Sequence, residues 1–343
     1  MAGHRKRPSN VPTFLTVAVL GIAVVASWWV FLKGDGVAEA KPKMTLAAVS
    51  TRPPEAVEAA PLPPSTPVAR PESEKPAEVP ETKPAPPPPA PTADATSRIR
   101  TLVEGGKQAL AANNPLSART NFNQALALVP AEPERTVVRR ELAKLGDEMI
   151  FSPRVYENDR LVARYVLQTG DTLAKVAVEH KVTADLLAFI NGIADKNLIR
   201  AGQTIKVIEG PFHAKVDKKT YTLDVLLGET LVRQFSVGLG ADDSTPNGTW
   251  KISSKLSNPT YHPPRGGAIL AADDPKNPLG ERWMGMVGVE GKSVGQERYG
   301  IHGTIEPESI GTPSSMGCIR LKNEDVEFLY NCLVEKHSLV VVE

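Results

Sequence analysis

A long proline-rich segment near the N-terminus limits how this chain can fold more than any other feature. Sixteen of the 31 prolines in the 343-residue chain fall within residues 40–95, and those at 86–89 are consecutive. Such a segment samples extended polyproline II backbone and cannot bury a core. We therefore predict that residues 33–96 form a linker and that the folded domains begin at about residue 97. A spacer is favoured over a partner-binding motif, because no second feature points to a partner.

An uncharged apolar run precedes the linker. Residues 11–32 contain no charged side chain, and their length matches the roughly 20 residues that span a bilayer. Basic residues at 5–7 come before the run, and tryptophans at 28 and 29 lie near its outer end. We predict a single-pass anchor in the cytoplasmic (inner) membrane, with residues 1–10 cytoplasmic and the C-terminal domains extracytoplasmic. The alternative is a signal peptide cleaved at Ala38-Glu39-Ala40, although the apolar run exceeds the usual 7–15 residues.

Charge and cysteine content exclude several classes of protein. Lys and Arg number 40 against 39 Asp and Glu, so no basic excess is available for nucleic acid. Two cysteines cannot staple a secreted disulfide scaffold. Zinc-type ligand spacings, a Walker A loop and a dinucleotide-binding turn are all missing from the sequence. We predict a protein that needs neither metal nor organic cofactor.

Residues 97–150 have the pattern of a small helical segment. Its small and aromatic residues fall at the spacings of one tetratricopeptide repeat: Gly106, Ala109, Ala118, Phe122, Ala125 and Pro130. A third helix is expected at about Glu134 to Glu148. One repeat buries little area, so structural packing is favoured over partner binding.

Residues 163–210 resemble a LysM module. The matching words are Tyr165–Leu173 (YVLQTGDTL), Leu186–Gly192 (LLAFING) and Ala201–Val207 (AGQTIKV). The resemblance implies a β-α-α-β fold that binds N-acetylglucosamine glycans, chiefly peptidoglycan or chitin. The glycan-binding residues would lie in two loops: Gly170, Asp171, Thr172 and Asn191. A LysM fold with little glycan affinity is the alternative, since fold does not fix function.

From residue 211 the pattern changes to strands. Apolar residues alternate over 221–227 and again over 235–239, with Gly228-Glu229 as a turn between the two runs. A helix is expected near residues 324–335, followed by a strand at Ser338–Val342. This predicts a mainly β, sandwich-like domain over residues 211–343.

A cysteine and a histidine in this last domain are candidates for chemistry. His302 and Cys318 lie 16 positions apart in YGIHGTIEPESIGTPSSMGCIRL, and Gly317 before the cysteine predicts an exposed turn. A thiol attacks as thiolate, and a neighbouring imidazole can take its proton and return it to a leaving amine. Cys332 falls in the predicted helix and is expected to be buried, so both thiols should be free.

The words around this pair closely resemble the signature of the L,D-transpeptidase (YkuD-type) catalytic domain. They are Ile-His-Gly-Thr from residue 301, Ser-x-Gly-Cys-Ile-Arg-Leu from 315 and Asn-Glu-Asp from 323. The stretches Thr245–Trp250 and Asn277–Gly280, with Trp283, match further blocks, so the resemblance covers residues 211–343. It implies an enzyme in which Cys318 attacks a peptidoglycan tetrapeptide stem and D-Ala leaves. The amine of a second stem then attacks the thioester, which gives a 3→3 cross-link.

The resemblance also implies roles for neighbouring residues. Gly303 stands where some relatives carry Ser, so a backbone carbonyl is expected to hold the imidazole tautomer. The amides of Gly317 and Cys318 would stabilise the oxyanion. Met316 replaces a second His of many relatives. The predicted substrate-binding residues are Arg320, Ser315, Tyr299 and Trp283.

Each of these substrate assignments has a structural alternative. Arg320 would instead pair with Glu324 or Asp325, and the aromatic rings would pack the core. Ser315 would orient the nucleophile loop, or its hydroxyl would be an ordinary turn hydroxyl. His262, before two prolines, is expected in a surface or lid role.

Two other functions fit the same residues. An L,D-carboxypeptidase would pass the acyl group to water, and sequence does not separate it from a transpeptidase. A non-catalytic peptidoglycan-binding scaffold would not need a thiol beside an imidazole. The predicted partners are therefore peptidoglycan stem peptides and glycan strands, with protein partners unknown.

Overall fold

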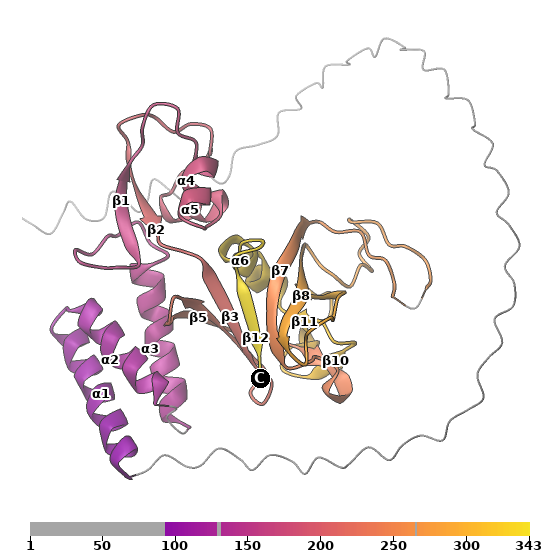
Figure 1. Cartoon of the computed structure of the whole chain (residues 1–343), viewed down its shortest axis with the longest axis horizontal. Helices are drawn as coiled ribbons and strands as arrows, with labels where there is room; N and C mark the ends of the chain where they lie inside the picture. The colour runs from indigo at the N-terminus through magenta and orange to yellow at the C-terminus, as the bar shows by residue number, and fades with distance from the viewer. Residues whose placement is uncertain (1–92, 129–131, 265) are drawn as a thin grey trace, which may run out of the picture. The chain divides into compact units, whose positions relative to one another are not determined.

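The computed structural model describes residues 93–128, 132–264 and 266–343 (Figure 1). The predicted cytoplasmic end, anchor and most of the linker lie outside the described residues. Within the residues described, no helix is both long and apolar enough to cross a membrane.

The N-terminal part of the described chain is helical, as predicted. It comprises α1 (Ala93–Ala111), α2 (Pro115–Ala127) and α3 (Glu134–Met149). Asn114 caps α2 by accepting a hydrogen bond from the Ser117 N–H, and Pro115 begins the helix. Glycine at 106 lets α1 approach α2, because a Cβ there would lie 2.6 Å from the ring of the buried Phe122.

The next module has the predicted β-α-α-β order of a LysM domain. It comprises β1 (Val162–Val166), α4 (Leu173–Glu179), α5 (Ala184–Ile190) and β2 (Thr204–Ile208), with β1 and β2 antiparallel. Thr172 and Thr183 cap the two helices through their side-chain oxygens.

The C-terminal domain is built on an eight-stranded sheet in the order β11-β9-β8-β7-β12-β3-β4-β5. Its strands are β3 (Phe212–Asp217), β4 (Thr222–Leu227), β5 (Thr230–Ser236), β7 (Gly248–Ser257), β8 (Arg282–Gly291), β9 (Tyr299–His302), β11 (Ile319–Arg320) and β12 (Leu339–Val342). A second, two-stranded sheet pairs β6 (Leu239–Gly240) with β10 (Pro313–Ser315), and α6 spans Asn323–Cys332.

The prediction of a mainly β domain is confirmed, but its sandwich-like layout needs correction. β12 pairs parallel with β3 and antiparallel with β7, which joins two groups of strands into one continuous, curled sheet (Figure 1). The final strand, β12, therefore joins the two groups, which would be separate sheets without it.

Helix α6 links the modules and buries the second cysteine. Cys332 is fully buried and free, as predicted. The ring of Phe328, one helical turn before Cys332, lies 4.8 Å from the ring of Phe151, after α3, and 6.3 Å from that of Phe189 of α5. The Arg233 guanidinium lies 4.0 Å from the centre of the same ring.

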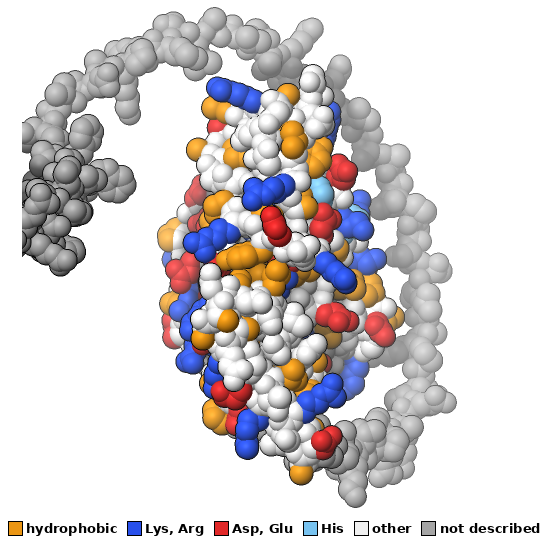
Figure 2. All heavy atoms as spheres, turned by 90° about the vertical axis from the view of Figure 1, so that its left-hand side faces the viewer, with side chains coloured by type: hydrophobic (Ala, Val, Ile, Leu, Met, Phe, Trp, Pro, Cys, Tyr) orange, Lys and Arg blue, Asp and Glu red, His pale blue; other side chains and the backbone are white. Residues whose placement is uncertain are grey.

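Charged side chains of both signs share the face of the molecule drawn in Figure 2. Figure 2 shows one face, on which Lys and Arg alternate with Asp and Glu instead of gathering into large patches of one sign. This distribution accords with the near balance of 40 basic and 39 acidic residues.

Candidate active site

The candidate nucleophile lies on a tight turn between β10 and β11. Gly317 has φ +127°, and a Cβ there would lie 2.7 Å from the Tyr299 ring and 2.9 Å from the Ser244 carbonyl oxygen. Only glycine fits both the backbone angle and the space. The turn leaves the Cys318 thiol partly exposed.

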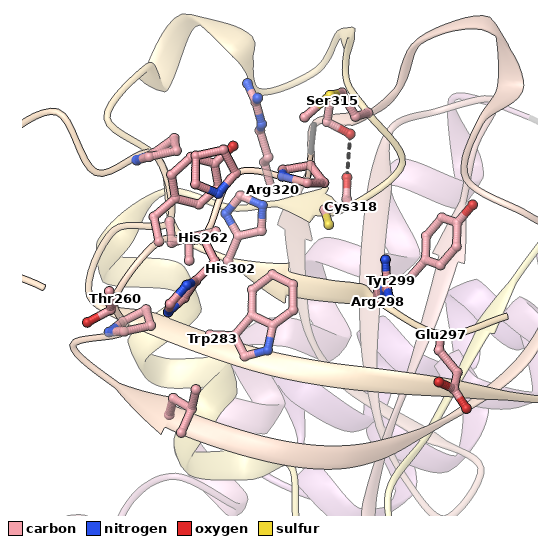
Figure 3. Close-up of a pocket in the computed structure, with 18 residues that line it drawn as sticks. Thr260, His262, Trp283, Glu297, Arg298, Tyr299, His302, Ser315, Cys318 and Arg320 are labelled. Atoms are coloured by element: carbon pink, nitrogen blue, oxygen red, sulfur yellow. Dashed lines mark hydrogen bonds between the residues drawn. The ribbon is translucent and has the colours of Figure 1, made fainter. Parts of the chain in front are cut away.

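Strand pairing brings the thiol and the imidazole together. β11 runs parallel to β9, with Ile319 opposite Ile301 and Arg320 opposite His302. Cys318, just before β11, and His302, at the end of β9, therefore both line the same pocket (Figure 3).

The tautomer of His302 follows from its hydrogen bond. Its Nδ1 lies 2.6 Å from the Gly303 carbonyl oxygen, which can only accept, so Nδ1 carries the proton and Nε2 is free to act as a base. The Trp283 ring stacks on the imidazole, with the ring centres 5.6 Å apart. Burial, with the charge of Arg320 as a smaller contribution, lowers the pKa of His302 to about 4. The imidazole is therefore neutral at pH 7.

The thiol is also neutral at rest. Burial raises the pKa of Cys318 above its ordinary value of 9.0, although a hydrogen bond with the Gly300 backbone and the charge of Arg320 act in the opposite direction. A neutral thiol and a neutral imidazole that line one pocket are the starting state that general-base catalysis requires.

Ser315 organises the turn. Its Oγ donates to the Cys318 carbonyl at 2.7 Å and accepts from the Gly317 N–H at 3.1 Å (Figure 3). The buried hydroxyl thus orients the loop backbone, which is one of the roles expected for Ser315. The Gly317 amide, predicted as an oxyanion donor, is occupied by this bond, which leaves the Cys318 N–H as the candidate donor.

Asn323, the first residue of α6, holds the peptide unit whose carbonyl, that of Gly303, accepts the hydrogen bond from His302. A Cβ at position 303 would lie 2.1 Å from Asn323 Oδ1, and that oxygen accepts from the Thr304 N–H at 3.1 Å. A serine at 303, as in some relatives, would therefore have to displace Asn323. No role for Asn323 followed from the sequence, although it stands in the matching Asn-Glu-Asp word.

Arg320 pairs with a residue that the sequence did not indicate. Its Nη1 lies 3.1 Å from Glu306 Oε2, so the predicted alternative pairing with Glu324 or Asp325 is wrong. The Nε of Arg320 is buried without a hydrogen-bond partner among the described residues. The guanidinium thus lies at the pocket with part of its donor capacity unused.

The pocket itself has a volume of about 780 Å³. All four predicted substrate residues line it with Cys318 and His302, and so do Met316 and His262. Tyr299 also packs against the buried Trp250, with ring centres 4.9 Å apart, so its ring belongs both to the core and to the side of the pocket. Glu297 and Arg298, on the loop before β9, also line the pocket and were not predicted from the sequence.

In the described part of the chain, no cluster of His, Cys, Asp or Glu could hold a metal ion.

The predicted glycan-binding side chains of the LysM domain are engaged within the module. Asp171 accepts from the Tyr165 hydroxyl and the Gln168 N–H, and Thr172 caps α4. Asn191 donates to the Leu187 and Lys206 carbonyls and accepts from the Lys206 N–H. These side chains shape the two loops. Gly170, with φ +89°, has open space beside it.

A partly exposed thiol and a neutral, oriented imidazole in one pocket form the site of a cysteine acyl-transfer enzyme. The model of the L,D-transpeptidase catalytic domain (YkuD) matches residues 211–342, and that of the LysM domain matches residues 165–207.

Curated relatives agree with the catalytic match. YqjB of Bacillus subtilis, named as an L,D-transpeptidase, is 35% identical over 127 residues, 37% of this chain and 68% of YqjB. YkuD of the same organism, similarly named, is 31% identical over 170 residues, 47% of this chain and 88% of YkuD. YbiS of Escherichia coli is 33% identical over 113 residues, 30% of this chain and 35% of YbiS. The chain belongs to the L,D-transpeptidase family.

Proposed function

We propose that this chain forms 3→3 cross-links in peptidoglycan through a thioester on Cys318. The observation that carries the proposal is the orientation of His302. The hydrogen bond between its Nδ1–H and the Gly303 carbonyl leaves Nε2 as a base in the pocket that Cys318 lines. Family membership supports the same reaction.

The first half-reaction transfers the stem peptide to the enzyme. Nε2 of His302 takes the thiol proton while the sulfur of Cys318 attacks the carbonyl carbon of the third stem residue. The Cys318 N–H stabilises the oxyanion, a type of donor that typically contributes ~10²–10³ in kcat. The intermediate then collapses, the bond to D-Ala breaks, and the imidazolium returns its proton to the leaving amine.

The second half-reaction returns the acyl group to an amine. The side-chain amine of another stem gives a proton to His302 and attacks the thioester, which forms the new amide and restores the thiol. Arg320 would bind a substrate carboxylate by exchanging its contact with Glu306. Its unpaired, buried Nε supports this exchange.

Muropeptide analysis by mass spectrometry tests the reaction. Purified enzyme incubated with tetrapeptide muropeptides should release D-Ala and produce 3→3 linked dimers. Release of D-Ala with tripeptides alone would favour the L,D-carboxypeptidase. No change in any muropeptide would favour the binding scaffold and overturn the proposal.

The LysM domain is proposed to hold the enzyme on glycan strands through the loops around residues 168–172 and 191–193. Deleting the module is a poor test, because Phe189 and Thr183 contact α6. A point variant is cleaner: Thr169→Trp places a bulky ring at an exposed position of the first loop. Retention on peptidoglycan sacculi should fall at least ~5-fold, about 1 kcal/mol. Processing of small soluble muropeptides should not change.

The matched control for this prediction is Thr101→Trp, on the exposed face of α1. It should leave sacculus retention unchanged. Equal retention of both variants would place glycan binding elsewhere.

The placement of the enzyme is also a proposal. An uncharged run of 22 residues and a 56-residue proline-rich spacer, about 170 Å long when extended, suit a site that reaches the wall from a membrane. We expect an N-in, C-out protein that fractionates with membranes. A mature N-terminus at Lys41 would replace the anchor with a cleaved signal peptide.

The TPR-like interpretation of α1–α3 rests on the close approach of Gly106 to Phe122. The helices are proposed to brace the catalytic domain, since Asp147 of α3 pairs with Arg233 of β5 and Arg139 pairs with Asp224 of β4. Specific capture of a peptide ligand by these helices would contradict a purely bracing role.

A further inference from the structure

A buried threonine hydroxyl connects the start of β7 with the nucleophile turn. Thr245 is 1% exposed and does not line the pocket. Its Oγ1 donates to the Gly317 carbonyl at 2.9 Å and accepts from the Gly240 N–H at 2.9 Å. The residue lies 72 positions from Gly317 in the sequence, so the contact exists only in the folded domain.

The bond from Thr245 acts on the peptide unit that joins Gly317 to Cys318. In a planar, trans peptide the C=O of one residue and the N–H of the next point in opposite directions. A donor that fixes the Gly317 carbonyl therefore fixes the direction of the Cys318 N–H. Ser315 holds the peptide units on either side, through the Gly317 N–H and the Cys318 carbonyl.

Thr245 is in turn held by Lys218, which follows β3. The Lys218 ammonium donates to the Thr245 carbonyl at 2.7 Å and to Asn247 Oδ1 at 2.8 Å, and it also pairs with Asp243. The hydroxyl thus acts from a fixed backbone. A glycine at 317 needs such support, because its own backbone is the least restricted of any residue.

We propose that Thr245 is a positioning residue that aims the Cys318 N–H at the oxyanion of the tetrahedral intermediate. The proposal rests on the acyl-transfer function given above. Thr245 touches neither the substrate nor the sulfur, so it acts on the rate of acylation and not on substrate affinity. Valine has nearly the same shape as threonine but neither donates nor accepts, so it would release the peptide unit.

The test compares Thr245→Val, Thr245→Ser and Thr249→Val in the full chain. Thr249 lies on β7, and its hydroxyl bonds only to Glu290 at the exposed surface. Two acylating probes are used: a tetrapeptide muropeptide and a carbapenem, which acylates a thiol through the same kind of oxyanion. Iodoacetamide is the third probe, since alkylation of the thiol passes through no oxyanion.

Thr245→Val should lower kcat for acylation ~10–100-fold with both acylating probes, about 1.4–2.7 kcal/mol. KM and the iodoacetamide rate should stay within about 2-fold. Thr245→Ser should recover most of the rate, and Thr249→Val should match the native chain. If the valine variant does not fold, Thr245→Ala replaces it, with the same expected loss of acylation rate and the same unchanged iodoacetamide rate.

Three results would overturn the inference. They are unchanged acylation in Thr245→Val, an equal loss in iodoacetamide alkylation, or failure of serine to restore the rate. Failure of the native chain to process the muropeptide would count against the proposed function instead. Carbapenem acylation would then still report on Thr245.

Discussion

Replacing Cys318 with alanine is expected to abolish acyl-enzyme formation and cross-linking, with a loss of about 10³-fold or more. Of the two cysteines, only Cys318 lines the pocket, and Cys332 is fully buried. Intact-mass spectrometry after addition of a muropeptide or a carbapenem measures the adduct directly.

Cys332→Ala is the matched control for this prediction. Complete burial raises the pKa of Cys332 to about 12, so its thiol does not ionise at neutral pH. The variant should keep full acylation and lose only ~1 kcal/mol of stability from the small cavity. An adduct that persists in Cys318→Ala, or disappears in Cys332→Ala, would show that Cys318 is not the nucleophile.

Replacing His302 with alanine should reduce turnover by about 10²–10⁴-fold, because its Nε2 is the base that the bond to Gly303 orients in the pocket of Cys318. Alkylation of Cys318 at pH 7 should also slow. His337→Ala, on the exposed turn before β12, is the control and should behave as the native chain. Equal alkylation rates in the native chain and His302→Ala would show that another group activates the thiol.

The pH dependence gives a second test of His302. Its folded-state pKa is depressed, so the base form persists as pH falls below the ordinary value of 6.5. We expect kcat/KM to stay level from pH 7 to about pH 5 and to fall as pH passes through about 4. An acid limb centred near 6.5 would contradict the buried, desolvated imidazole.

Local patterns were enough to predict much of this molecule. The resemblance to a LysM module predicts the order of its elements, and the helical pattern around Cys332 predicts its burial. The glycine after His302 left a backbone carbonyl as the natural acceptor for Nδ1, and the structure has that bond.

Features that depend on distant partners were not predictable. Alternating apolar residues predict a strand but do not indicate which strand it pairs with. The position of β12 between β3 and β7 could therefore not be predicted. The same holds for the Arg320–Glu306 pair, for Asn323 beneath Gly303 and for the hydroxyl of Thr245. Each arises from a loop whose path only the folded sheet determines.

The central place of β12 also sets the order of events during synthesis. Without residues 339–342, the sheet consists of a four-stranded half, β11-β9-β8-β7, and a three-stranded half, β3-β4-β5. Chains emerge from the ribosome N-terminus first, so both halves are made before the strand that joins them. The catalytic sheet is therefore complete only after translation has passed residue 342. By then the nascent chain already carries the whole LysM module.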